Sequence, residues 1–115
     1  MKELIKITRE ELDMILKNHE LWFATDGKAG EKADLSHTDL RGFNLTKVNL
    51  SDVDLSGADL SGANLRHANL IVANLRGAIL DHADLTCTDL SGSTFKPASI
   101  RGAILRQVTL TNAKL

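Results

Sequence analysis

An apolar residue recurs at every fifth position from Leu35 to Leu115 without interruption. This period fits neither regular secondary structure. In an α-helix, residues five apart lie about 140° apart around the axis, so they form no buried stripe. In a strand, an odd spacing sends alternate side chains to opposite faces of the sheet. The chain must therefore change direction once in every repeat, and a closed coil with these side chains inside meets that requirement.

The other positions of the five-residue unit follow rules of their own. Two residues before each large apolar residue the chain is mostly Ala, and the residue directly before it is mostly Asp or Asn. Gly often stands two residues after it. The side-chain period of two places the Ala on the inward side, while Asx and Gly are typical of turns. Each unit therefore predicts a short extended piece followed by a corner, and Pro97 is expected at such a corner.

Runs such as Ala58-Asp59-Leu60-Ser61-Gly62 and Ala63-Asn64-Leu65-Arg66 resemble the pentapeptide repeat family, and the resemblance covers residues 33–115. It implies an all-β solenoid, namely a right-handed quadrilateral β-helix with four repeats in each coil. About four coils would then form a stack about 20 Å tall, given the usual spacing between strands.

The large apolar residues of this series form the predicted core, and burial of each is worth about 2 kcal/mol before conformational entropy is counted. They are Leu35, Leu40, Leu45, Leu50, Leu55, Leu60, Leu65, Leu70, Leu75, Leu80, Leu85, Leu90, Phe95, Ile100, Leu105 and Leu110. Phe43, Val48, Val53 and Val108 replace the small inward residue. We interpret the first three as filling a wider end of the interior rather than as lining a ligand pocket.

Residues 1–32 lack the repeat and are predicted to form a capping helix and a linker ahead of the β-helix at 33–115. Thr8 and Glu11 match a capping box, which predicts a helix over residues 9–23. A solenoid end exposes apolar core and unpaired strand edges, so a cap is expected there. The predicted cap residues are Leu12, Ile15, Leu16, Trp22, Phe23 and Phe43. A helix that presents Trp22 to a partner protein is the alternative.

No comparable segment follows the last repeat, so Leu105, Leu110 and Leu115 form a candidate C-terminal interface. The family resemblance implies head-to-head pairing through such coils, and we therefore expect a homodimer. An artificially shortened chain and a terminus that tolerates exposure are the alternatives.

Composition argues against several classes of partner. The net charge is −1 and aromatic residues make up only 3% of the chain, which provides no base-stacking platform for nucleic acid. No apolar run approaches the roughly 18 residues of a membrane span. Cys87 is the single cysteine, and the first residues do not read as a signal peptide, so a cytoplasmic location is expected.

Residues twenty apart should be stacked neighbours, which allows the outer surface to be searched for chemistry. Asp34 and Asp54 form a like-charge pair, and His67 shares a column with Cys87. Two ligands fall short of a zinc site, and no third group orients the thiol. Turn chemistry and coincidence are the favoured interpretations, so no catalytic residue, metal site or cofactor is predicted. Asp81 is expected to pair with Arg101.

Charge changes along the chain, because residues 33–60 carry five acids and two bases whereas residues 61–115 carry three acids and six bases. This charge gradient would either steer a partner protein or consist of ordinary hydrated surface charges. The sequence thus predicts a non-catalytic structural or protein–protein interaction module with an unknown protein partner. The resemblance adds one alternative, since some quinolone-resistance members mimic DNA and bind DNA gyrase. That role requires a long and strongly acidic rod. An exported effector is a further alternative.

Overall fold

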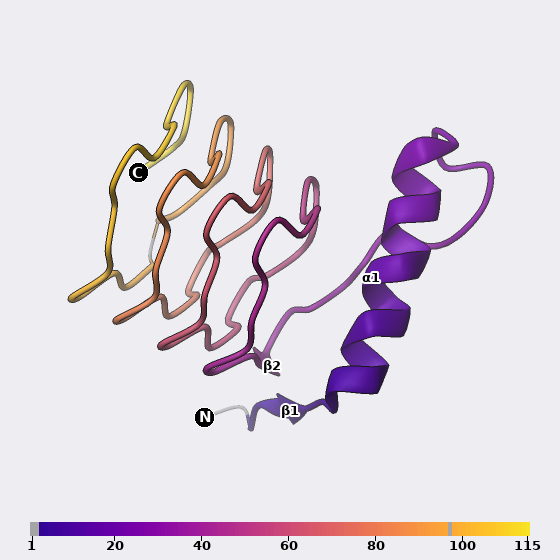
Figure 1. Cartoon of the computed structure of the whole chain (residues 1–115), viewed down its shortest axis with the longest axis horizontal. Helices are drawn as coiled ribbons and strands as arrows, with labels where there is room; N and C mark the ends of the chain where they lie inside the picture. The colour runs from indigo at the N-terminus through magenta and orange to yellow at the C-terminus, as the bar shows by residue number, and fades with distance from the viewer. Residues whose placement is uncertain (1–2, 97) are drawn as a thin grey trace.

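The structure is a computed structural model that describes residues 3–96 and 98–115. Strand β1 (Ile5–Lys6) leads into helix α1 (Arg9–Ala24), and strand β2 (Thr38–Asp39) belongs to the first of a series of stacked coils (Figure 1). The corner predicted at Pro97 lies outside the described residues.

The coils are held together by parallel backbone pairing between residues twenty apart. Isolated bridges run from Asp34 and Asp54 at the start of the stack to Thr94 and Lys114 at its end. Between two neighbouring coils, for example, the Leu45 amide donates to the Asn64 carbonyl at 2.7 Å. This register matches the expected period, and it places every fourth repeat on the same side of the stack.

Each corner is built from the residue types that the repeat supplies. In the repeats whose corners the structure describes, the residue two positions after the large apolar residue has a positive φ, whether it is Gly57 at 68° or Lys47 at 63°. The Asx residue folds back onto this corner: Asp54 Oδ1 accepts hydrogen bonds from the Ser56 amide at 2.9 Å and the Ser56 hydroxyl at 2.6 Å. The Asx side chains therefore stabilise the turns, as the pattern predicts.

The interior is a column of leucines flanked by alanines, and the predicted core residues from Leu35 to Leu90 are buried, as is Phe95. Val53 is also buried, while Phe43 and Val48 are partly buried against the core. Polar residues in inward positions form hydrogen bonds. Thr88 Oγ1, for example, donates to the Leu65 carbonyl at 2.6 Å. No buried side-chain polar atom of the described residues lacks a hydrogen bond.

The last tier departs from the predicted core. Ile100 is exposed, and Leu105 and Leu110 are exposed by 48% and 43%. The prediction that these three are core residues is therefore wrong for this structure. The physical reason is that a tier is buried only between two neighbours, and these residues have a described neighbour on one side only.

Helix α1 begins as the sequence predicts and ends one residue later than expected. Thr8 caps it: the Glu11 amide donates to Thr8 Oγ1 at 3.1 Å, and the Thr8 amide donates to Glu11 Oε1 at 2.9 Å. These bonds lower the pKa of the Glu11 carboxyl. Within the described residues, no helix combines the length and apolarity that a membrane crossing needs.

Strand β1 was not predicted. It pairs in parallel with β2, with Ile5 opposite Thr38 and Lys6 opposite Asp39, and the Ile5 amide donates to the His37 carbonyl at 2.7 Å. The chain before α1 thus adds a short strand to the free edge of the first coil, which is one recognised way to protect such an edge.

Candidate docking site at the ends of the stack

Helix α1 lies across the first end of the stack, and its buried residues are Leu12 and His19. Ile15 and Leu16 pack partly buried against the same core. Phe23 was predicted to cover the first coil, but it is 47% exposed, and Trp22 is half-buried and stacks on His19 with ring centroids 5.6 Å apart. The prediction for Phe23 is wrong because the earlier turns of the helix supply the contacts with the core.

His19 joins the helix to both the first coil and the linker. The Ala33 amide donates to His19 Nδ1 at 3.0 Å, so Nδ1 carries no proton and Nε2 donates to the Ser51 carbonyl at 2.8 Å. Burial lowers the pKa of His19, since the charged ring would be removed from water. This arrangement fits the neutral imidazole only.

Helix α1 is also held by a hydrogen bond from Arg9 to the first coil and by the close approach of the linker at Gly30. Arg9 Nη1 donates to the Asn44 carbonyl at 2.6 Å, and Arg9 also pairs with Asp13 at 3.0 Å. At Gly30, an added Cβ would lie 2.3 Å from the Asn18 carbonyl oxygen, which shows how closely the returning linker approaches α1. The first end of the stack is therefore closed by specific polar contacts as well as by apolar packing.

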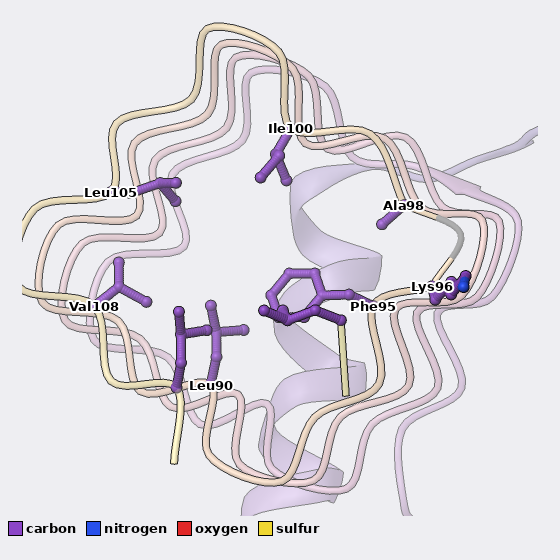
Figure 2. Close-up of a pocket in the computed structure, with 9 residues that line it drawn as sticks. Leu90, Phe95, Lys96, Ala98, Ile100, Leu105 and Val108 are labelled. Atoms are coloured by element: carbon purple, nitrogen blue, oxygen red, sulfur yellow. The ribbon is translucent and has the colours of Figure 1, made fainter. Parts of the chain in front are cut away.

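The opposite end of the stack is hollow. A cavity of about 620 Å³ opens there, and its lining is almost wholly apolar. Figure 2 looks into this end: Phe95, Ile100, Leu105 and Val108 point inward, while α1 lies behind them across the far end. Leu110 and Leu115 also line the cavity. The structure therefore brings together the three residues of the candidate C-terminal interface at one exposed apolar face.

The rim of this face is basic. Residues 90–115 contain Lys96, Arg101, Arg106 and Lys114 and no acid. All four side chains belong to exposed residues, and none forms an ion pair with any residue that the structure describes. The C-terminal end thus combines an apolar centre with a rim of exposed cationic side chains.

The side walls offer no comparable arrangement. Among the described residues, no group of three or more His, Cys, Asp or Glu side chains is placed to hold a metal ion. Cys87 Sγ donates to Gln107 Oε1 at 3.1 Å, so its hydrogen-bond partner is an amide rather than His67. Val72, Ile79 and Ile104 are exposed apolar residues on the walls, outside the cavity.

Several carboxylates on the side walls already form ion pairs or hydrogen bonds with other residues of the walls. The Arg41 guanidinium holds Asp39 at 2.8 Å and lowers the pKa of that carboxyl to about 2. Asp81 was predicted to pair with the Arg101 side chain, but its carboxylate accepts bonds from the Ser99 hydroxyl and from the Arg101 backbone amide at 2.9 Å. The Ser99 bond is the main reason why the pKa of Asp81 is lowered. The expected ion pair is thus replaced by hydrogen bonds between Asp81 and the next coil.

No role was assigned to His19 from the sequence. The signal was a polar residue at an apolar position, seven residues after Leu12 and therefore on the same face of the helix. Such a residue must find hydrogen-bond partners when buried. The partners come from Ala33 and Ser51, which no local pattern could identify.

A stack of coils with a leucine core and Asx corners defines a class of solenoid proteins. The sequence profile described as pentapeptide repeats matches residues 31–66 and 58–96, with eight copies. The chain belongs to the pentapeptide repeat family, and the fold implied by its solved relatives is the quadrilateral β-helix. No curated protein matches the chain significantly in sequence.

Two solved structures support this assignment. A pentapeptide repeat protein from Nostoc PCC 7120 is 33% identical with a TM-score of 0.71, and the match covers 95% of this chain and 79% of that one. A pentapeptide repeat protein from the thylakoid lumen of Arabidopsis thaliana is 25% identical with a TM-score of 0.67. That match covers 70% of this chain and 56% of the Arabidopsis chain, so this chain spans just over half of that structure.

The plasmid-mediated fluoroquinolone resistance protein QnrB1 also matches, at 22% identity over 73% of this chain and 60% of that one. Its TM-score is 0.32, which is too low to support an argument about function.

Proposed function

We propose that this protein is a non-catalytic protein–protein interaction module and that the apolar face at the C-terminal end of its stack is the docking surface. One observation carries the proposal: a cavity of about 620 Å³ is lined by Ile100, Leu105, Leu110 and Leu115, all of them exposed. Exposed apolar patches of this kind mark interaction sites in soluble proteins. Self-association through this face is the form of docking that we propose to test first.

The walls support a structural rather than a chemical role. Their Asx side chains are bound to the corners of their own repeats, as Asp54 is to Ser56 and Asp84 is to Thr86. An enzyme needs a nucleophile, a base and an orienting group around a concave site, and the one deep apolar cavity described above holds no such set. Membership of a family of repeat proteins points the same way.

Mimicry of DNA is less well supported than docking through the end. A DNA mimic needs free carboxylates in a regular array, whereas Asp39 is paired with Arg41, and Arg41 also lies 4.0 Å from Asp59. Arg66 pairs with Asp84 at 3.2 Å further along the stack. Paired carboxylates present less negative charge to a DNA-binding partner.

The test is the mass of the full chain in solution, measured by sedimentation velocity over a range of concentrations. We expect association that Leu110→Lys weakens about 100-fold, because the change places a charge in the centre of an apolar contact. Val72→Lys is the matched control, since Val72 is an exposed apolar residue on the wall. A monomer at every concentration, or association that Leu110→Lys leaves unchanged, would overturn the proposal.

A further inference from the structure

Resting on the proposed function, we infer that the occupant of the C-terminal end is the outer face of α1 from a second copy, so that chains join head to tail. The outer face is defined by Glu10, Met14, Lys17, Leu21 and Ala24, which are all exposed. Three observations support this occupant: the charge of the rim, the composition of the outer face, and the way α1 already covers the first end.

The rim argues against two identical ends facing each other. A two-fold pairing of the C-terminal ends would bring Lys96, Arg101, Arg106 and Lys114 of both copies to one interface, with no acid from residues 90–115 to offset them. Like charges placed across an interface cost several kcal/mol and suppress pairing. The face therefore favours an acidic occupant over a second basic rim.

The outer face of α1 has the required composition. Met14 is 68% exposed and Leu21 is 47% exposed. Being seven residues apart, they lie on one side of the helix, about 160–180° from the buried Leu12. The helix carries four acids (Glu10, Glu11, Asp13 and Glu20) and two bases (Arg9 and Lys17), a net charge of −2. The outer face itself holds one acid, Glu10, and one base, Lys17. The other acids of the helix lie to its sides, where Asp13 pairs with Arg9 at 3.0 Å. The outer face thus presents two apolar side chains, and the excess of acids stands mainly at its flanks, which would face the rim.

The molecule itself shows that a helix fits across a coil end. The inner face of α1 covers the first end with Leu12 and His19 fully buried, and Figure 2 shows the helix spanning the hollow of the stack. The C-terminal end presents the same kind of leucine tier, because its residues continue the same columns. A second helix laid across it would bury Met14 and Leu21 against Leu105 and Leu110.

Such an interface is heterologous, since each copy contributes two different surfaces. Growth therefore does not stop at a dimer, and the mean mass rises with concentration unless the chains close into a ring. The contact between the basic rim and the acidic helix also weakens as ionic strength rises, because salt screens exposed charges. A two-fold dimer through the same apolar face has like-charged rims and shows the opposite salt dependence.

Two double variants distinguish the arrangements. The helix variant carries Met14→Lys and Leu21→Lys, and the end variant carries Leu105→Lys and Leu110→Lys. Each changes only exposed side chains, so each is expected to stay folded, with a cooperative melting curve. Val72→Lys is the control for an added charge on the wall. Sedimentation velocity is run on each variant alone and on an equimolar mixture.

We expect each variant alone to be monomeric, with association weakened about 100-fold, since each lacks one of the two surfaces. The mixture is expected to form a one-to-one dimer that does not grow, because one intact end meets one intact helix. A helix variant that associates like the parent chain, together with a mixture that forms no mixed dimer, would overturn the head-to-tail inference and leave docking through the end intact. A parent chain that stays monomeric would overturn both.

Discussion

The first and the last tiers of the stack consist of the same kind of side chain but meet different surroundings. The first tier, with Leu35 to Leu50, is buried under α1, and its polar edge is tied to Arg9 and His19. The last tier, with Ile100 to Leu115, is exposed around a cavity. Similar repeats thus give a closed surface at one end and an exposed apolar face at the other.

This difference teaches that the repeat determines the interior but not the ends. The large apolar residue of a repeat is buried only when a neighbouring coil or a cap covers it. At the first end the cap is α1, whose sequence lacks the five-residue repeat. The polar contacts of that segment set its position on the stack. We therefore expect substitutions near the first end to affect stability, and matched substitutions near the last end to affect association instead.

The largest contrast is expected from one substitution made in one column at both ends. Leu50 and Leu110 are sixty residues apart and so belong to the same column, but Leu50 is fully buried and Leu110 is 43% exposed. Leu50→Lys should prevent folding, because an unpaired buried charge costs at least about 4 kcal/mol. Leu110→Lys should lower the free energy of unfolding by less than about 1 kcal/mol. Urea denaturation followed by circular dichroism measures both; equal losses would remove the distinction between the ends.

A smaller effect is expected at the linker that returns from α1. Gly30 has a φ of 72°, and an added Cβ would meet backbone atoms of Asn18 and Trp22 at 2.3 and 2.8 Å. Gly30→Ala should therefore lower the free energy of unfolding by about 2–4 kcal/mol and loosen α1. Gly62 has a φ of 68° with no atom within 4 Å of an added Cβ, so Gly62→Ala should cost only about 1 kcal/mol. The fluorescence of Trp22 during urea denaturation measures the free energy of unfolding of Gly30→Ala. If this variant loses no more free energy of unfolding than Gly62→Ala, the close approach of the linker to α1 is unimportant for stability.

Much of the fold was predictable because the repeat is local. Each corner is made by residues within one repeat, such as Asp54 and Ser56, so the sequence contains the whole cause. The capping box of Thr8 and Glu11 is local in the same way. The family and the twenty-residue register followed from these patterns.

The contacts of the first end were not predictable, because they join residues far apart in the sequence. His19 binds Ser51 and Ala33, and Arg9 binds Asn44, through backbone groups that carry no side-chain signature. Strand β1 has two residues, too few for a hydrophobic pattern. The exposed C-terminal face was predicted as a candidate interface, whereas the function, the partner and the cytoplasmic location stay predictions.

The hydrogen bonds of His19 predict that the free energy of unfolding depends on pH through the first end of the stack. The folded protein holds His19 with a lowered pKa, so the unfolded chain binds more protons as the pH falls below the usual value near 6.5. Stability from this group is therefore complete above about pH 6.5 and decreases as the pH falls through the folded pKa, by at most about 1.4 kcal/mol per pH unit. Asp52 and Lys32 are the charged groups that act on the ring, the first raising its pKa and the second lowering it.

The measurement is the free energy of unfolding from urea titrations between pH 8 and pH 5. His19→Leu should flatten the dependence in this window, because it removes the titrating group. His67→Asn is the matched control: it removes an exposed His at a corner where Asn tolerates the positive φ of 60°, and should leave the slope unchanged. A slope that persists in His19→Leu would assign the pH dependence to another group.

The smallest effect is expected at the start of α1. Thr8→Ala removes the hydroxyl that accepts from the Glu11 amide, and should lower the free energy of unfolding by about 1 kcal/mol. Thr111→Ala changes an exposed Thr in the last tier and should lower it by less than about 0.5 kcal/mol. Hydrogen exchange should show faster exchange in the first turn of α1 for Thr8→Ala alone, with the coils unchanged. Because the first end combines this cap with the His19 and Arg9 contacts, α1 should stay docked; exposure of the first tier in Thr8→Ala would show that the cap, rather than those contacts, holds the helix in place.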